Sequence, residues 1–342
     1  MQIEVDEVEI RSGVRGGQTL GSPIALWIQN RDFENWREVM DPMKLDPRKV
    51  ELRRLRSPRP GHADLSGGLK FLRNDLRDIL ERASARESAA RVAAGAIAKT
   101  LLREFGIEIA SGVRHLGSIG IDSPLPEWRD LVEVDDESPL RAIDRSIEAD
   151  MVAEVDRARK EGDTLGGAVT VIAHNVPPGL GSHVQWNEKL DGLLTQAVMS
   201  VPAVKAVEIG SALQASRARG SEAHDAIEYH DTQGWHRPTN RAGGLEGGVT
   251  NGADVVITAY KKPISTLRKG LPSVDLDTLE ARTSQYERSD VTALPAAGII
   301  AEAMVALVLA DALLTKLGGD SMQEVEAHWQ TTRALQSKWP RD

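Results

Sequence analysis

The sequence predicts an α+β fold in which strands and helices alternate irregularly along the chain. Short apolar runs bounded by glycine, proline and polar residues indicate strands, and two long stretches with helical spacing indicate central helices. The order of these segments lacks the regular repetition of a doubly wound sheet or a barrel. A layered α+β architecture is therefore expected.

The expected strands are short. Apolar and acidic residues alternate from Gln2 to Ile10, which is typical of a half-buried strand. Further strands are expected at residues 24–28, 169–172, 205–209 and 255–260, and polar loops at residues 30–36, 52–64 and 220–240. A loop as long as the last one is often an active-site lid, so this segment is predicted to cover a site.

Helices are expected from Ser84 onward and at residues 139–161, 187–200 and 296–317. Ser84 and Glu87 have the spacing of a capping box, and the alanines and glycine that follow predict a helix that neighbouring backbone approaches closely. The last helix is apolar on nearly every face. It contains Glu302 and Asp311, so it is interpreted as a buried helix of a soluble protein and not as a membrane span.

Composition excludes several classes of protein. The net charge of -9 argues against a nucleic-acid or anionic-membrane partner. The absence of cysteine excludes disulfides and thiolate metal sites. A reducing cytoplasmic location fits this composition. An anionic ligand must therefore meet a local basic cluster, and the loop at residues 52–64 is the densest one in the chain.

Two segments are candidates for anion binding. Arg82, Ser84 and Arg86 stand at the start of the predicted alanine-rich helix, where free N–H groups and the helix dipole favour an anion, although an ordinary capped helix has the same pattern. The run Gly243 to Gly248 resembles a phosphate-binding loop. It lacks the lysine of a P-loop and the spacing of a dinucleotide fingerprint, so a tight turn explains it equally well.

Two residues are candidates for proton transfer. His62 lies in a turn where Asp64 is expected to orient its imidazole, although a single histidine is more often structural. Asp290 precedes the last helix, where partial burial is expected to make it a better base while Arg288 opposes that effect. The histidines of residues 220–240, and His174 with His183, match no standard zinc spacing, so no metal site is predicted.

Several of these segments, in this order, resemble the chorismate synthase family. The blocks that carry the resemblance span nearly the whole chain: residues 21–25 (GSPIA), 30–32 (NRD), 59–64 (RPGHAD), 81–87 (ERASARE), 91–95 (RVAAG), 179–182 (GLGS), 240–248 (NRAGGLEGG), 262–266 (KPIST), 288–290 (RSD) and 294–298 (LPAAG).

The resemblance implies one domain over residues 1–342, a β-α-β sandwich with helices layered between antiparallel sheets, assembled as a homotetramer. It implies a carbon–oxygen lyase of the shikimate pathway of aromatic amino-acid biosynthesis. The implied reaction is a 1,4-anti elimination of phosphate from 5-enolpyruvylshikimate 3-phosphate, giving chorismate and requiring reduced FMN. NADPH is a possible reductant.

The resemblance also implies roles for residues. His62 is similar to a family histidine that acts as an acid, and Asp290 to an aspartate that helps the flavin N5 accept a proton. Substrate and FMN together carry two phosphates and two carboxylates, which calls for guanidinium groups. The implied substrate-binding residues are Arg59, Arg86 and Arg288. The implied FMN contacts are Arg82, Ala83, Ser84, Gln214, Ala215, Gly247, Gly248, Lys262, Pro263, Ile264, Ser265, Thr266 and Arg288.

The sequence departs from the family pattern at its start. Members normally begin with a Gly-Glu-Ser-His-Gly block and an arginine-rich glycine segment, and neither occurs in this sequence. A chain without that segment would lack a second catalytic histidine, and impaired activity is expected. The alternatives are a non-catalytic flavin-binding or assembly module of the same fold, and a different phosphate-handling enzyme.

Overall fold

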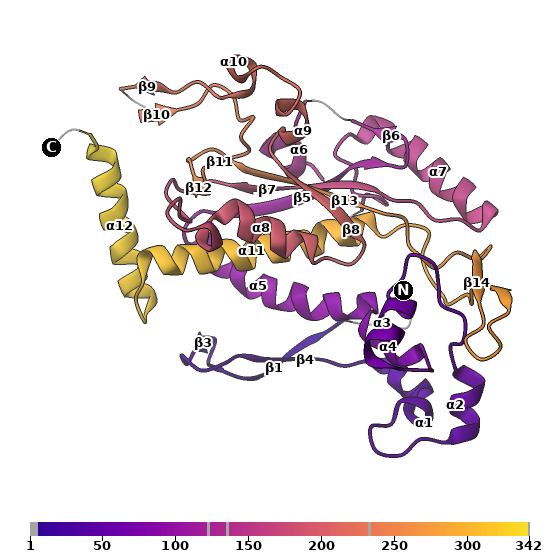
Figure 1. The fold of residues 1–342 in the computed structure, drawn as a ribbon. Coiled ribbons are helices and arrows are strands. Elements are labelled where there is room, and N and C mark those ends of the chain that lie inside the picture. The colour runs from indigo at the N-terminus through magenta and orange to yellow at the C-terminus, as the bar shows by residue number, and fades with distance from the viewer. Residues whose placement is uncertain (1–5, 122–123, 135–136, 232–233, 341–342) are drawn as a thin grey trace. The chain divides into compact units, whose positions relative to one another are not determined.

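The structure, a computed structural model, describes residues 6–121, 124–134, 137–231 and 234–340 (Figure 1). The chain divides into two compact units, each built from three segments. The first unit comprises Met1–Ala93, Ala153–Leu165 and Pro263–Ala293, and the second comprises Ala94–Val152, Gly166–Lys262 and Leu294–Asp342. The expectation of one domain over residues 1–342 stays a prediction.

The first unit contains short elements. They are β1 (Val8–Ser12), β2 (Val14–Arg15), β3 (Gln18–Thr19), β4 (Ala25–Ile28), η1 (Arg31–Asn35), α1 (Arg37–Met40), α2 (Pro47–Arg53), α3 (Asp64–Phe71), α4 (Arg77–Arg82), η2 (Ala85–Glu87), β14 (Pro272–Val274) and β15 (Ala281–Thr283). Helices α5 (Ser88–Glu104) and α7 (Glu148–Glu161) begin in one unit and end in the other.

The second unit contains the large sheet and the longest helix. Its elements are β5 (Glu108–Leu116), β6 (Ile119–Gly120), α6 (Trp128–Val132), η3 (Arg145–Ile147), β7 (Gly167–His174), η4 (Trp186–Glu188), α8 (Leu190–Met199), β8 (Val204–Ile209), α9 (Ala212–Ala215), α10 (Gly220–Ala223), β9 (Glu228–His230), β10 (Gly234–His236), β11 (Leu245–Glu246), β12 (Val249–Thr250), β13 (Val255–Lys261), α11 (Leu294–Leu317) and α12 (Met322–Lys338).

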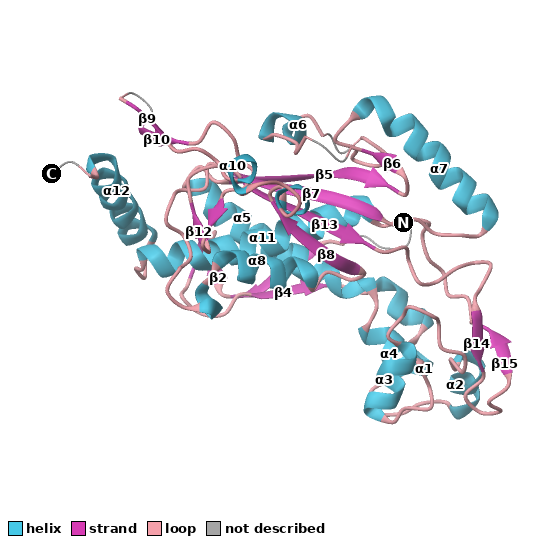
Figure 2. Cartoon of the chain, turned by 45° about the horizontal axis from the view of Figure 1, so that its top comes forward, coloured by secondary structure: helices cyan, strands magenta, loops and turns pink. Residues whose placement is uncertain are grey.

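The main sheet of the second unit is antiparallel, with the strand order β6-β5-β7-β13-β8. Helices α8 and α11 pack against it, and α6 packs against β5 and β7 (Figure 2). Under α6, Leu131 packs on Ile172 and Val256, which face each other across β7 and β13. The α+β class with antiparallel sheets is confirmed.

Helix α5 crosses α11 closely within the second unit, as its small residues predicted. A Cβ atom added to Gly95 would lie 2.3 Å from the Cβ atom of Ala303. Glu302 is buried at this contact, and its carboxylate accepts hydrogen bonds from Ser111 Oγ at 2.6 Å and Lys99 Nζ at 2.5 Å. The close approach and the internal ion pair together fix the position of the two helices.

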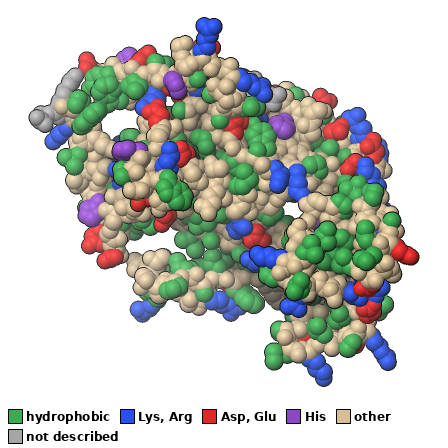
Figure 3. Space-filling view, viewed as in Figure 1, with side chains coloured by type: hydrophobic (Ala, Val, Ile, Leu, Met, Phe, Trp, Pro, Cys, Tyr) green, Lys and Arg blue, Asp and Glu red, His purple; other side chains and the backbone are tan. Residues whose placement is uncertain are grey.

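Among the described residues, α11 is the one helix that is long and apolar enough to cross a membrane by length and composition. Half of its residues, including Glu302, are buried against other parts of the second unit. The interpretation of α11 as the core helix of the unit is therefore confirmed. On the face shown in Figure 3, basic and acidic side chains are interspersed.

Three sequence-based boundaries were wrong. Residues 31–35 form the 3-10 turn η1 and not an open loop, because Asp32 accepts hydrogen bonds from the side chains of Asn35 and Trp36. Helix α7 begins at Glu148 and not at residue 139, because Ala142 forms a bridge with Val113 of β5. Residues 220–240 hold α10 and the β9–β10 hairpin where a loop was expected.

Candidate functional site

The first unit holds a buried ionic cluster of Arg59, His62 and Asp64. The side chains of Arg59 and Asp64 are only 5% and 1% exposed. Arg59 donates to Asp64 through Nε at 2.8 Å, through Nη2 at 2.9 Å and through its backbone N–H at 3.0 Å. His62 Nδ1 lies 2.5 Å from Asp64 Oδ1. The expectation that Asp64 orients the imidazole of His62 is therefore confirmed.

The ionisation of Asp64 follows from these contacts. Burial alone would raise the pKa of this carboxyl, but hydrogen bonds from Arg59 and His62 outweigh burial and hold the pKa well below its ordinary value. An ionised carboxylate only accepts hydrogen bonds, so His62 Nδ1 carries the proton that points at Asp64. Arg59 Nη2 lies 3.0 Å from His62 Nδ1 and 3.3 Å from Nε2. With Nδ1 committed to Asp64, Nε2 is the nitrogen left to exchange a proton with a ligand.

Three blocks far apart in the sequence meet at this cluster. Arg59 Nη1 donates to Thr266 Oγ1 at 2.9 Å, and Ser265 Oγ donates to the carbonyl of Gly61 at 2.9 Å. Ser289 Oγ donates to the carbonyl of Thr266, also at 2.9 Å. Residues 59–64, 263–266 and 288–290 thus form one connected region of the first unit. Thr164 supports it from a fourth segment by donating to the carbonyl of Ile264 at 2.7 Å.

The structure places Ser84 at the start of the helical segment that was predicted there. Arg82 is the last residue of α4 and is exposed, Ala83 follows as its C-cap, and α5 begins only at Ser88. Ser84 Oγ accepts a hydrogen bond from the backbone N–H of Arg86 and so caps the 3-10 turn η2. Turn η2 runs directly into α5, so Ser84 caps this helical segment and Arg82 precedes the cap.

The side chain of Arg86 contacts residues outside the Arg59–His62–Asp64 cluster. Its guanidinium pairs with Asp6 and donates to the carbonyl of Gln29 at 3.3 Å. It also lines a cavity of about 330 Å³ between β4 and α5, together with Trp27 and Asn30. Its predicted role in substrate binding stays a prediction.

Asp290 is exposed, which corrects the expectation that partial burial makes it a better base. Arg288 is exposed as well, and its charge lies near enough to Asp32 to help lower the pKa of that carboxyl. Hydrogen bonds from Asn35 and Trp36 are the larger causes of this shift. The 288–290 block therefore lies at the solvent-accessible side of the region, with Ser289 as its link to Thr266.

The sequence placed Arg53 in the basic loop at residues 52–64, but it did not indicate Arg77 or the ring that both arginines contact. Trp36 carries two guanidinium groups on its ring, with Arg53 at 4.6 Å and Arg77 at 4.7 Å from the centroid. Arg77 is buried and pairs with Glu287 at 2.9 Å, next to Arg288 in the sequence. Burial raises the pKa of Glu81, although Arg77 opposes the shift. Trp36, close behind the Asn-Arg-Asp block at residues 30–32, was the one sequence signal for an aromatic ring that arginines could contact.

The second unit holds the other residues that the resemblance implied. Gly247 and Gly248 form the β11–β12 turn with φ values of 61° and 90°, which favour glycine. A Cβ atom on Gly248 would lie 2.7 Å from Lys189, so this turn serves close packing. Gln214 and Ala215 lie in α9, and Ala215 lines a cavity of about 540 Å³ beside Arg241.

Three lysines lie close together at the end of β13. Burial, followed by the charge of Lys262, lowers the pKa of Lys261 to about 8. Burial, followed by the charge of Lys205, also lowers the pKa of Lys262. The sequence singled out Lys262 alone, whereas the structure adds Lys261 and Lys205 to a positively charged patch in the second unit.

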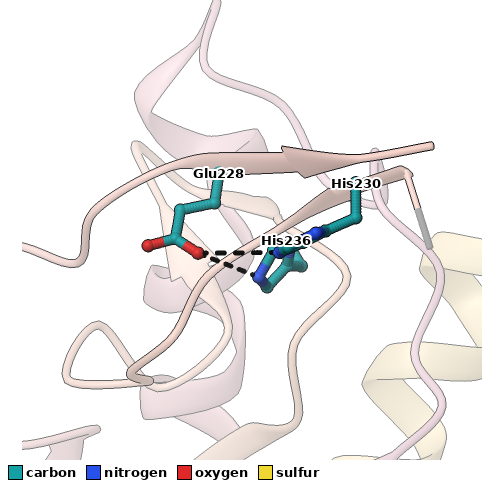
Figure 4. A group of neighbouring side chains, drawn as sticks. All are labelled: Glu228, His230 and His236. Carbon is teal, nitrogen blue, oxygen red and sulfur yellow. Dashed lines mark ion pairs between the residues drawn. The ribbon is translucent and has the colours of Figure 1, made fainter. Parts of the chain in front are cut away.

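No metal site was predicted among the histidines of residues 220–240, but two of them lie close together in the structure. The β9–β10 hairpin brings Glu228, His230 and His236 together, with their donor atoms within 4.8 Å of one another (Figure 4). The sequence spacing could not show this grouping, because it depends on the register of the hairpin.

Comparison with known proteins agrees with the fold and the clustered blocks. The model of a family described as chorismate synthase matches residues 1–314. The chain is 54% identical to the chorismate synthase of Moorella thermoacetica, over 95% of this chain and 84% of that protein. It is 53% identical to the chorismate synthase of Thermus thermophilus over the same shares of the two chains.

A solved structure described as a chorismate synthase matches with a TM-score of 0.78 and 39% identity, over 98% of this chain and 86% of that chain. The fold and these relatives define a carbon–oxygen lyase. The chain belongs to the chorismate synthase family.

Proposed function

We propose that this chain converts 5-enolpyruvylshikimate 3-phosphate to chorismate by a 1,4-anti elimination of phosphate that requires reduced FMN. The observation that carries the proposal is the convergence of residues 59–64, 263–266 and 288–290 on the Arg59–His62–Asp64 cluster. A histidine with one fixed nitrogen beside a buried guanidinium suits an elimination that releases a dianionic group.

The proposed acid is His62. Asp64 holds the hydrogen on Nδ1, so a proton given to or taken from the leaving phosphate passes through Nε2. Arg59 is largely used in holding Asp64 and Thr266, so its contribution is to keep the cluster rigid and to balance the charge of Asp64. Arg288, which is exposed, is the cation of this region that we propose to meet the substrate, together with Arg86.

Asp290 is proposed to help the flavin N5 accept the proton that leaves the substrate carbon. It stands one residue after Ser289, whose hydroxyl is fixed by the carbonyl of Thr266, so the backbone that carries Asp290 is held in place. Its exposure leaves it accessible to a ligand.

The residues of the first unit fit an anionic flavin. Arg82 is exposed at the end of α4, Ser84 carries a hydroxyl two residues later, and residues 263–266 offer hydroxyl and backbone groups beside the Arg59–His62–Asp64 cluster. When bound, reduced FMN would lend electron density to the breaking C–O bond and recover it afterward. The flavin contacts implied in the second unit, at Gln214, Ala215, Gly247, Gly248 and Lys262, stay predictions, as do a homotetramer, NADPH as reductant and a cytoplasmic location.

The test is an anaerobic assay of chorismate formation with chemically reduced FMN. His62→Asn removes the imidazole and with it Nε2, and it should lower kcat by about 100-fold or more, the range in which general acids contribute. His328→Gln is the matched control, because His328 contacts the carbonyl of Leu317 at 2.8 Å in the second unit and belongs to none of the blocks of the site, and it should retain parental kcat. Equal kcat values for the parent and His62→Asn would overturn the assignment of His62.

A further inference from the structure

The β9–β10 hairpin carries a donor set that the proposed reaction does not use. In its antiparallel register His236 faces Glu228, and His230 lies two residues from Glu228 on the same strand. Side chains two apart on a strand, and directly opposite across a pair, share one face of the ribbon. Glu228, His230 and His236 therefore project from a single face and point toward one another (Figure 4).

The distances suit a small cation. Glu228 Oε2 lies 3.3 Å from His236 Nε2 and 3.9 Å from His230 Nε2. Ligand atoms bound about 2.0–2.1 Å from a tetrahedral zinc ion are about 3.3 Å apart, by the geometry of the tetrahedron. The two imidazole rings lie 4.5 Å apart at 36°, so both nitrogens can approach one point with small side-chain rotations.

In His236 the nitrogen that can reach an ion is Nε2. His236 is half-buried, and its Nδ1 is buried with no hydrogen-bond partner within the described part of the chain. Its polar function therefore depends on Nε2, which is directed at the Glu228 carboxylate. The opposite face of the hairpin carries the Tyr229–Trp235 pair, whose rings meet edge to face at 5.1 Å and hold the strand register.

We propose that Glu228, His230 and His236 form a binding site for a divalent transition-metal ion, of which Zn²⁺ is the best fit. Two imidazoles and one carboxylate are borderline ligands that suit Zn²⁺ better than Mg²⁺ or Ca²⁺, which prefer oxygen donors. Three protein ligands leave one tetrahedral position for water. An isolated two-stranded hairpin is marginally stable, so the ion acts as a clip between β9 and β10.

The first experiment measures Zn²⁺ binding by calorimetry on tag-free protein freed of metal by chelation, with Co²⁺ absorption as a report on coordination geometry. The parent should bind one ion per chain. His230→Gln and His236→Gln should each weaken binding at least about tenfold, because even the loss of a group that only orients a metal ligand costs about that much. His224→Gln is the matched control, since His224 is exposed in the same segment and lies outside the cluster.

The second experiment follows hydrogen exchange of the hairpin amides with and without Zn²⁺. Zn²⁺ should slow exchange in β9 and β10 of the parent and of His224→Gln, and it should have no effect in His230→Gln. Circular dichroism checks that each variant is folded. The proposal is overturned if the parent takes up no Zn²⁺, or if His230→Gln and His236→Gln bind it as tightly as His224→Gln does.

Discussion

Replacing Asp64 by asparagine removes the charge on which the buried cluster depends. The Asp64→Asn change keeps the size of the side chain, but it leaves Arg59, only 5% exposed, without its carboxylate partner. Removing one partner of a buried ion pair costs about 3–5 kcal/mol. Asparagine keeps one acceptor oxygen, so we expect the free energy of unfolding to fall by about 3 kcal/mol.

Asp277→Asn is the matched control for this prediction. Asp277 also pairs with an arginine through two hydrogen bonds, to Arg54 at 2.9 and 3.0 Å, but its side chain is 41% exposed. An exposed pair contributes about 0–1 kcal/mol. Urea unfolding followed by circular dichroism measures both variants. If Asp64→Asn loses no more stability than Asp277→Asn, the cluster does not stabilise the first unit as its burial indicates.

Stability should also depend on pH and on helix packing in three measurable ways. The low pKa of folded Asp64 makes its stabilisation complete above the ordinary value of 3.8 and lost as pH falls below it, so acid unfolding should show a stability loss that Asp64→Asn lacks. Burial lowers the pKa of Lys261 to about 8, so folded Lys261 loses its charge between about pH 8 and the ordinary value of 10.5 while the unfolded chain keeps it. The free energy of unfolding should therefore rise with pH across that range in the parent, and urea unfolding of Lys261→Met should show a smaller rise. Gly95→Ala should cost about 1–3 kcal/mol in the same assay because its Cβ would overlap Ala303, whereas Gly192→Ala in α8, where a Cβ meets nothing within 4 Å, should be neutral or stabilising.

Local patterns predicted much of the fold. The strands around residues 24–28, 169–172, 205–209 and 255–260 and the helices ending near residues 200 and 317 all form. Helix α5 was predicted to approach its neighbours closely, and Gly95 against Ala303 does so. The predictions failed where a side chain or a bridge overrides local propensity, as where Ala142 pairs with Val113 and delays α7.

The site was predictable in part. His62 and Asp64 are two residues apart, so their contact follows from the turn that joins them. The contact of Arg59 with Thr266 joins segments more than 200 residues apart, and no local pattern specifies it. The exposure of Asp290 was also beyond prediction, because it depends on which segments cover the loop before α11. Motif order pointed to these residues, whereas only the fold shows their surroundings.

The hairpin site illustrates the same limit. His230 and His236 are separated by five residues, a spacing found in zinc histidine pairs, but no cysteine pair completes a standard zinc pattern, so the expectation of no metal site set this signal aside. Antiparallel pairing places residue 236 opposite residue 228 and so creates the group. A grouping of this kind is set by strand register.

The central claim is most directly tested by the stoichiometry of one anaerobic reaction. The purified chain is mixed with 5-enolpyruvylshikimate 3-phosphate and reduced FMN, and chorismate, phosphate and the flavin oxidation state are measured together. We expect equal amounts of chorismate and phosphate, with the flavin still reduced at the end and no product when only oxidised FMN is present. Phosphate release without chorismate, or at the same rate without reduced flavin, would contradict it.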